Sequence, residues 1–262
     1  MKIIDFHAHI YPEKIAEKAV KSIGDFYNIN MTGSGTSEEL IKGGSAAGVT
    51  NYVVHSVAVT ENTVVAINNF IASEIKKHNE FYGFGTMHAG FEDKIGETER
   101  MLSLGLQGIK IHPDTQKYNM DDKRMFPLYD YLREMKIPLL IHTGDYRYDY
   151  SHPRRLCHIL KEFPGIITIG AHFGGWSMCD LAYEFLENEN CYVDTSSAFW
   201  MLGKRRAEEL IKMYGAERVL FGTDFPMWKA KDELATIYEM NLTDDEKSLI
   251  FYKNAERILK AD

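Results

Sequence analysis

Eight short apolar runs recur along the chain, and they constrain its fold more than any other feature. Each is six to eight residues long, rich in Val, Ile, Tyr and Phe, and ends in small or polar residues. Runs of this length and composition predict buried strands rather than helices. They occupy residues 2–9, 51–58, 81–88, 106–112, 137–142, 166–172, 191–196 and 219–224.

Helical patterns lie between most of these runs. Strands that alternate with helices pair in parallel through helical crossovers. Eight such units in roughly 250 residues match the size of a barrel of eight strands and eight helices. We therefore predict an α/β fold, a single-domain (β/α)8 TIM barrel spanning residues 1–262. The predicted helices cover residues 63–78, 94–104, 123–135, 153–163, 203–214 and 243–260.

Two segments have distinctive local signals. The last predicted helix follows Thr-Asp-Asp-Glu at 243–246, the signature of a capping box. The widest interval between strands, residues 10–50, predicts an additional helix and a mobile loop, either a disordered segment or a lid over the site.

Charge and composition exclude several classes of partner. Thirty Lys and Arg against thirty-eight Asp and Glu give a net charge of −8. Nucleic-acid binding requires a basic stripe and membrane-surface binding a basic amphipathic face, and we expect neither. No apolar run approaches the ~18 residues of a membrane span. The N-terminus has no export signal, and the three cysteines have no CxxC spacing. We expect a cytoplasmic protein with a small-molecule substrate, and a homodimer is left open.

Histidines gather at the predicted strand ends, where the active sites of such barrels are built. Seven of the ten lie within or at the end of a strand: His7, His9, His55, His88, His112, His142 and His172. His7 and His9 are two residues apart and therefore share one face of their strand. If that face is the barrel interior, both imidazoles converge at its mouth.

A carboxylate and further imidazoles complete a candidate metal site. His142, His172 and Asp224 each end a strand immediately before a turn signal. Several imidazoles with one carboxylate suit a divalent ion, with Zn²⁺ the first expectation and Mn²⁺, Fe²⁺, Co²⁺ or Ni²⁺ as alternatives. The alternative for Asp224 is a helix cap or a salt bridge to a basic residue such as Lys110 or Arg147.

Taken together, these motifs resemble the amidohydrolase superfamily, in particular its amidohydrolase-related ("amidohydrolase 2") branch. That branch includes aminocarboxymuconate semialdehyde decarboxylase and related non-oxidative decarboxylases. The motifs occur in barrel order over nearly the whole chain. They are DxHxH at 5–9, GIKIHP at 108–113, IHTG at 141–144, AHFGG at 171–175, GTDFP at 222–226 and NAERIL at 254–259.

The resemblance implies a role for each matching residue. His7, His9 and His142 would be metal ligands, and Asp224 would touch the metal and shuttle a proton. His172 would bond the reacting group, as in the decarboxylase branch. Alternatively, His172 and a carboxylated Lys110 would hold a second ion, as in two-metal members.

Several assignments near the barrel mouth remain open. An uncompensated ammonium is costly inside a barrel, so Lys110 is expected to pair with an interior acid, Asp5 or Asp194. Four residues are weaker substrate-binding candidates, with packing as the alternative for each: His55, His112, Arg147 and Trp176. Of these, Arg147 could clamp a substrate carboxylate with both arms of its guanidinium.

Three functions follow, in order of expectation. The first is hydrolysis of a small carboxylate-, amide- or lactone-bearing molecule by metal-activated water, with Asp224 as base and acid and His172 stabilising the oxyanion. The alternative is metal-dependent non-oxidative decarboxylation of an unsaturated or aromatic acid. The third is a barrel that binds a metal or ligand without turnover, which the presence of both Asp224 and His172 disfavours.

Overall fold

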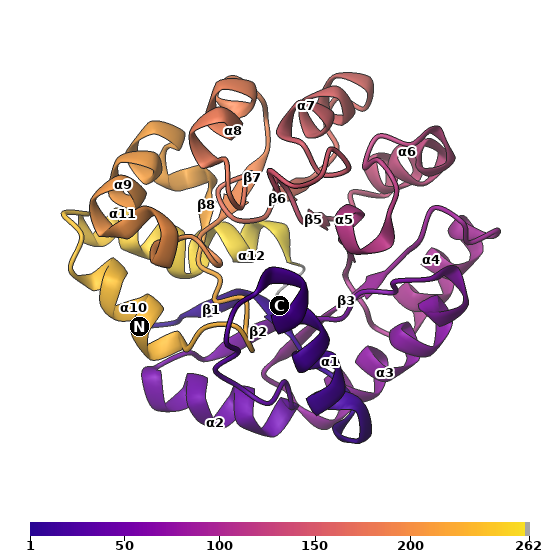
Figure 1. The fold of residues 1–262 in the computed structure, drawn as a ribbon, viewed down its shortest axis with the longest axis horizontal. Helices are drawn as coiled ribbons and strands as arrows, with labels where there is room; N and C mark the ends of the chain where they lie inside the picture. The colour runs from indigo at the N-terminus through magenta and orange to yellow at the C-terminus, as the bar shows by residue number, and fades with distance from the viewer. Residues whose placement is uncertain (260–262) are drawn as a thin grey trace.

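The computed structural model describes residues 1–259 and confirms the predicted (β/α)8 barrel. Eight parallel strands follow one another in chain order around a ring, and helices surround it (Figure 1). All eight predicted runs contain a strand. The strands are β1 (Ile4–His9), β2 (Asn51–His55), β3 (Phe81–Thr86), β4 (Gly108–Ile111), β5 (Leu139–Ile141), β6 (Thr168–Gly170), β7 (Tyr192–Asp194) and β8 (Val219–Leu220).

Backbone hydrogen bonds join the first strand to the last. The Phe6 amide donates to the Phe221 carbonyl at 2.8 Å, and the His9 amide donates to the Phe225 carbonyl at 2.7 Å. The buried Asp5 carboxylate accepts from both the amide and the hydroxyl of Thr223, at 3.0 and 2.6 Å. The strand-1 histidines are thereby brought beside Asp224, which is far away in sequence.

The outer helices largely match the predicted ones. The helices observed between β2 and residue 238 are α3 (Val64–Lys77), α4 (Lys94–Ser103), α5 (Pro113–Gln116), α6 (Phe126–Met135), α7 (Pro153–Glu162), α8 (Cys179–Leu186), α9 (Phe199–Tyr214) and α10 (Ala230–Tyr238). Of these, α5, α8 and α10 are not among the sequence predictions. Helix α9 starts four residues before the predicted Gly203, which interrupts it with a left-handed φ of 67°.

The predicted C-terminal helix is divided into three parts. It begins with the expected capping box, in which the Thr243 hydroxyl accepts from the Glu246 amide while the Glu246 carboxylate accepts from the Thr243 amide. The parts are α11 (Asp244–Ser248), a π-helical turn (Leu249–Lys253) and α12 (Asn254–Ile258). The predicted last residue, Lys260, lies outside the described residues.

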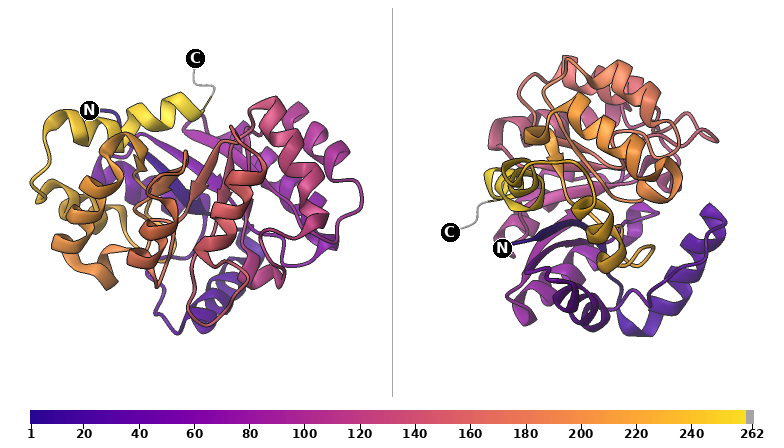
Figure 2. Two further views of the ribbon diagram at one scale, coloured as in Figure 1. Left: turned by 90° about the horizontal axis from the view of Figure 1, so that it is seen from above. Right: turned by 90° about the vertical axis from the view of Figure 1, so that its left-hand side faces the viewer.

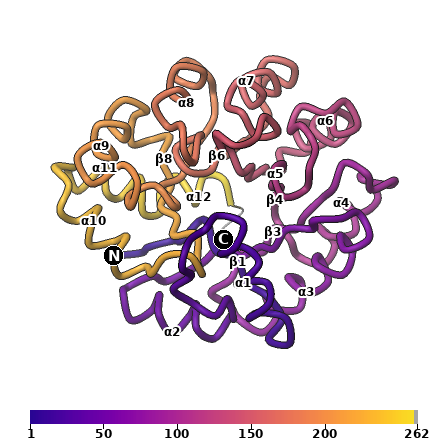
Figure 3. The backbone as a smooth tube through the Cα atoms, viewed as in Figure 1, coloured from indigo at the N-terminus to yellow at the C-terminus, as the bar shows by residue number. Residues whose placement is uncertain are grey.

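The long segment after β1 forms two helices rather than one. They are α1 (Glu13–Tyr27) and α2 (Ser37–Ala47). Figure 2 shows α1 projecting from one end of the barrel, and the trace in Figure 3 places it in front of the ring. Because Tyr27, at the end of α1, contacts His112 just after β4, this helix lies at the end of the barrel where the strands finish.

Apolar side chains fill the opposite end of the barrel. Interior side chains from the strands pack there against Ile258 and Leu259 at the end of α12. They include Phe6, Phe84 and Leu140, which are fully buried. Polar side chains in the barrel therefore gather towards the end covered by α1. Within residues 1–259, no helix has both the length and the apolar character of a membrane span.

Candidate metal centre

Three predicted ligands meet at the end of β1. The Nε2 atoms of His7 and His9 are 3.3 Å apart. The Oδ1 atom of Asp224 lies 3.3 Å from the first nitrogen and 3.4 Å from the second. We call these three atoms the donor triangle. It confirms the inference that the two histidines share an inward face.

The protonation of His7 is fixed by Asp194, at the end of β7. His7 Nδ1 lies 2.8 Å from the Asp194 carboxylate, which can only accept, so Nδ1 carries the proton and Nε2 presents its lone pair. Burial, followed by the Lys110 charge, lowers the pKa of His7 to about 4, so the ring is neutral at pH 7. Burial opposes ionisation of Asp194, but His7 and His172 hold the pKa of this carboxyl below its ordinary range.

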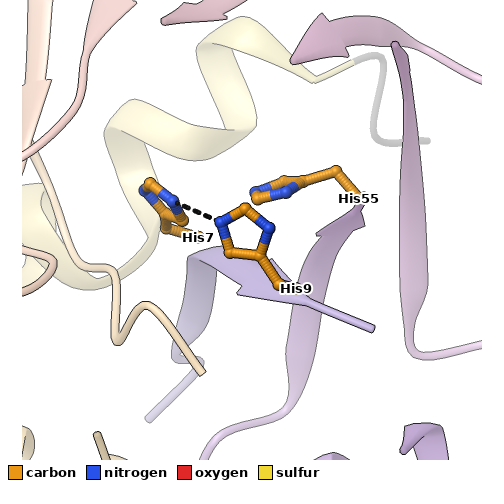
Figure 4. A group of neighbouring side chains, drawn as sticks. All are labelled: His7, His9 and His55. Atoms are coloured by element: carbon orange, nitrogen blue, oxygen red, sulfur yellow. Dashed lines mark hydrogen bonds between the residues drawn. The ribbon is translucent and has the colours of Figure 1, made fainter. Parts of the chain in front are cut away.

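A third imidazole from β2 joins this group. His55 is fully buried, and its ring meets that of His9 edge to face, with centroids 4.4 Å apart (Figure 4). One nitrogen from each of His7, His9 and His55 lies within 4.8 Å of the others. Neither nitrogen of His55 has a hydrogen-bond partner among the described residues.

The donor set fits a divalent metal ion. Corners of a triangle with edges of 3.3 and 3.4 Å lie about 1.9 Å from its centre. Imidazole and carboxylate ligands of Zn²⁺ lie about 2.0–2.2 Å from the ion, so the three atoms are close enough together to be held by a single ion. The imidazole lone pairs and the buried carboxylate also favour positive charge beside them, part of which the Lys110 ammonium supplies at 3.0 Å from His7 Nε2. The residues present therefore suit a nitrogen- and oxygen-binding cation.

The loops after β5 and β6 pack backbone against backbone. A Cβ on Gly144 would lie 2.4 Å from the Gly175 Cα, and Gly144 has a φ of +77°. The glycines after His142 and His172 thus permit an approach that a larger residue would block. His142 Nδ1 lies 3.0 Å from His172 Nε2 as a result.

A chain of acceptors sets the tautomers of this pair. His172 Nδ1 lies 2.8 Å from the Ser196 carbonyl, which can only accept. Nδ1 therefore carries the proton of His172, and its Nε2 accepts from His142 Nδ1. His142 is left with a free lone pair on Nε2, the atom a metal ligand would use.

The structure does not place His142 in the donor triangle. Its Nε2 instead lies 3.3 Å from the Asp114 carboxylate and 3.5 Å from the Tyr27 hydroxyl. Its ring stacks on that of His112, with centroids 3.8 Å apart and planes inclined by 6°. His112 Nε2 is 2.7 Å from the same hydroxyl. His142 thus remains a proposed ligand that would turn from Tyr27 towards the ion.

Asp224 is held by neighbours on both sides. Its Oδ2 accepts from the Ser197 hydroxyl at 2.6 Å, and that hydroxyl accepts from the Trp228 indole at 2.7 Å. Asp224 has a left-handed φ of 60°, which is costly for a residue with a side chain. Burial opposes its ionisation, but His7, His9 and His172 hold its pKa well below the ordinary range.

The structure contradicts the expectation that Lys110 pairs with Asp5 or Asp194. Its fully buried ammonium lies 3.0 Å from His7 Nε2. Among residues 1–259, no hydrogen bond or ion pair joins Lys110 to either predicted partner: Asp5 bonds Thr223 and Asp194 bonds His7. Burial lowers the pKa of Lys110 to about 8. The role of Lys110 and His172 in holding a second ion stays a prediction.

The structure also contradicts the expectation that Arg147 could clamp a substrate carboxylate. Its Nε and Nη2 bond the Asp145 carboxylate at 3.0 and 2.6 Å, and its Nη1 donates to the Phe26 carbonyl at 2.6 Å. The guanidinium also lies over the rings of Phe26 and Tyr27. The guanidinium fork is therefore occupied by Asp145 and is not free to clamp a substrate carboxylate. Instead it fixes the end of α1 to the loop after β5.

Aromatic rings line one side of the mouth. We call Tyr27, Trp176, Trp200 and Trp228 the aromatic wall. Trp176 lies 4.7 Å from Tyr27 and 6.4 Å from Trp200 between ring centroids, and Trp200 stacks on Trp228 at 5.7 Å. Trp200 is 48% exposed, whereas Trp176 is buried and its indole nitrogen has no hydrogen-bond partner within residues 1–259. The wall therefore runs from the interior to the solvent.

Two residues that contact the predicted site, Asp194 and Tyr27, were not assigned to it from the sequence. Asp194 is the last residue of β7 but lies inside the apolar run 191–196 rather than at its end, and it was considered only as a partner for Lys110. Tyr27 carries no strand-end signal, because a helix brings it to the site.

A family comparison identifies the chain. The amidohydrolase family model matches residues 4–261. The chain belongs to the amidohydrolase family. This confirms the resemblance inferred from the strand-end motifs and assigns the chain to a superfamily of metal-dependent enzymes.

Solved structures with the same fold cover the whole amidohydrolase barrel. An uncharacterised TIM-barrel protein from Bordetella bronchiseptica has a TM-score of 0.84 at 21% identity, over 99% of both chains. 5-Carboxyvanillate decarboxylase from Sphingomonas paucimobilis has a TM-score of 0.76 at 16% identity, over 100% of this chain and 99% of that one. Dihydroxybenzoic acid decarboxylase from Polaromonas sp. JS666, with bound manganese and 2-nitroresorcinol, has a TM-score of 0.76 at 16% identity, over 99% and 97%.

Proposed function

We propose that this protein is a divalent-metal-dependent decarboxylase of a small aromatic carboxylic acid. The observation that carries the proposal is the direct link between the donor triangle and the aromatic wall. Ser197 bonds both Asp224 and the Trp228 indole, so a site for oxygen atoms adjoins a site for a flat ring. The names of the similar solved structures support this over hydrolysis, which remained the first expectation from sequence.

The proposed ligands of the ion are His7, His9 and Asp224, joined by His142. A bound divalent ion supplies a Lewis acid that draws electron density from substrate oxygens as charge develops. Mn²⁺ is a fitting candidate because a similar structure holds it, and Zn²⁺ remains the alternative.

The chain's own groups would manage the proton. Decarboxylation breaks the bond between the ring carbon and the carboxylate carbon, and a proton replaces the carbon dioxide that leaves. Neutral His172 donates its one ring proton to the Ser196 carbonyl and accepts on the other nitrogen. It therefore has no proton directed at a substrate. We assign proton relay to Asp224 and orientation of His142 to His172.

The aromatic wall would hold the ring of the substrate. Offset or edge-to-face contacts with tryptophan favour flat rings over aliphatic chains. Arg147 would contribute indirectly, by keeping Tyr27 at the mouth. The Tyr27 hydroxyl stays protonated because burial, followed by the Asp224 charge, raises its pKa well above the ordinary value.

Product analysis tests the reaction class. The Mn²⁺-loaded protein is assayed with 2,6-dihydroxybenzoate, 5-carboxyvanillate, aryl lactones and aryl amides in ¹⁸O-labelled water. We expect carbon dioxide release without ¹⁸O in the aromatic product, and a loss of at least ~100-fold in kcat for Asp224→Asn. Lactone or amide cleavage with ¹⁸O in the product and no carbon dioxide would establish hydrolysis instead.

A further inference from the structure

His55 is a buried polar side chain that protein contacts leave unsatisfied. It ends β2, is fully buried, and neither ring nitrogen has a partner among the described residues. Buried polar atoms without partners reduce stability, and each such group in a native fold needs an explanation. A packing role alone would be served better by an apolar side chain of similar volume.

The backbone fixes where this imidazole points. His9 and His55 are register partners on the parallel pair β1 and β2, and partners in register face the same side of the sheet. Since His9 faces the barrel interior, His55 does too. Figure 4 shows its ring beside those of His7 and His9. The centroids of His55 and His7 lie 5.0 Å apart.

The surroundings of His55 select the kind of ligand. The rings of His7 and His9 lie beside it, and neither one forms a hydrogen bond with His55 among the described residues. One nitrogen from each of the three histidines lies within 4.8 Å of the other two. Two imidazole nitrogens bound to one Zn²⁺ ion lie at most about 4.2 Å apart, so side-chain adjustment would bring all three histidines within reach of a single cation.

We propose that His55 is a further ligand of the divalent cation held by His7, His9 and Asp224. This proposal rests on the metal centre of the proposed function. It adds β2 to the strands that hold the ion, and it makes the donor set richer in imidazole than the sequence motifs indicate. A nitrogen-rich set favours borderline ions such as Zn²⁺, Co²⁺ and Ni²⁺ over Mg²⁺ or Ca²⁺.

Co²⁺ titration of the full chain tests the ligand directly. The metal-free protein and His55→Ala are titrated with Co²⁺, and affinity and the visible absorption spectrum are recorded. We expect His55→Ala to bind Co²⁺ at least ~10-fold more weakly and with a changed spectrum, because coordination number sets band intensity. His88→Ala is the matched control: this histidine follows β3 and faces the Gln116 carbonyl, and its removal should change neither readout.

The outcomes are separable from those of the activity assay. Co²⁺ affinity within twofold of the parent and an unchanged spectrum in His55→Ala would overturn the proposal. If that variant fails to fold, His55→Gln is judged by the same two readouts. Weakened Co²⁺ binding in a protein that decarboxylates none of the acids would support His55 as a ligand while rejecting the proposed reaction. A parent protein that binds no Co²⁺ would overturn the centre and this ligand together.

Discussion

Asp194 shows how one carboxylate can decide whether a histidine is able to bind metal. It accepts from His7 Nδ1 and also from the His172 and Ser196 amides, at 2.9 and 3.1 Å. These bonds hold the carboxylate in place and direct the His7 lone pair towards the donor triangle. A histidine that binds a metal through one ring nitrogen almost always donates from the other to a carboxylate, a backbone carbonyl or water.

We predict that Asp194→Asn weakens divalent-metal binding by about 10- to 100-fold. The asparagine oxygen can keep the two backbone bonds, which leaves its NH₂ facing His7. That donor would force the proton of His7 onto Nε2 and remove the lone pair from the triangle. Calorimetric titration with Mn²⁺ measures the change, and Asp145→Asn, which alters the buried partner of Arg147, serves as control. Unchanged affinity in Asp194→Asn would show that the His7 tautomer is fixed by something else.

The positions of the site residues could be predicted from the sequence only where spacing along a strand determines them. His7, His9 and Asp224 meet as expected, because alternation along a strand and order around the barrel specify their positions. The orientation of His142 could not be predicted, because it depends on ring rotation and on Tyr27, a residue from a helix. Arg147 failed as a free clamp because Asp145, two residues away, already occupies its guanidinium.

At the scale of elements, strands were more predictable than helices. Each buried strand is a dense apolar run, whereas helices at the rim need only a narrow apolar stripe. Helix α10 was missed because its buried face includes Glu233 between the apolar positions. The second helix of the 10–50 segment was missed because it contains two adjacent glycines and follows a stretch rich in glycine, serine and threonine, although Thr36 caps it by accepting from the Glu39 amide.

The buried carboxyl group of Glu233, on α10, makes the free energy of unfolding depend on pH. Its Oε2 is buried and has no hydrogen-bond partner in the described part of the chain, and burial, followed by the Asp5 charge, raises its pKa to about 8. The folded state then holds a proton that the unfolded state releases near pH 4.5, so stability falls as pH rises from there to about 8. We predict that Glu233→Gln is more stable than the parent by about 1–3 kcal/mol at pH 9 and nearly equal to it below pH 4.5.

Urea unfolding at several pH values measures this difference. Glu239→Gln, at the exposed end of the same helix, is the control and should follow the parent throughout. A Glu233→Gln curve parallel to that of the parent from pH 4.5 to 9 would contradict the raised pKa.

For the whole molecule, the sequence predicted the architecture but not how the barrel closes. β8 has only two residues, and the segment after it completes the pairing with β1 through Phe221 and Phe225. The proposed metal ligands lie on both sides of this seam: His7 and His9 on β1, and Asp224 after β8. An ion bound between them would therefore connect the first and last strands of the barrel.

Metal binding should then stabilise the fold as a whole, and the seam in particular. At a free Mn²⁺ concentration of about 100 times Kd, linkage adds about 2.7 kcal/mol to the free energy of unfolding. For a chain of this size that corresponds to a rise in Tm of roughly 5–10 °C, which chelation should reverse. Asp224→Asn is the control, and its Tm should respond much less to Mn²⁺.

Hydrogen exchange locates the effect: added Mn²⁺ should slow exchange most at the seam amides of Phe6, His9 and Asp224, which donate across it. Protection spread evenly over all eight strands would mean that the ion stabilises the barrel without joining its ends.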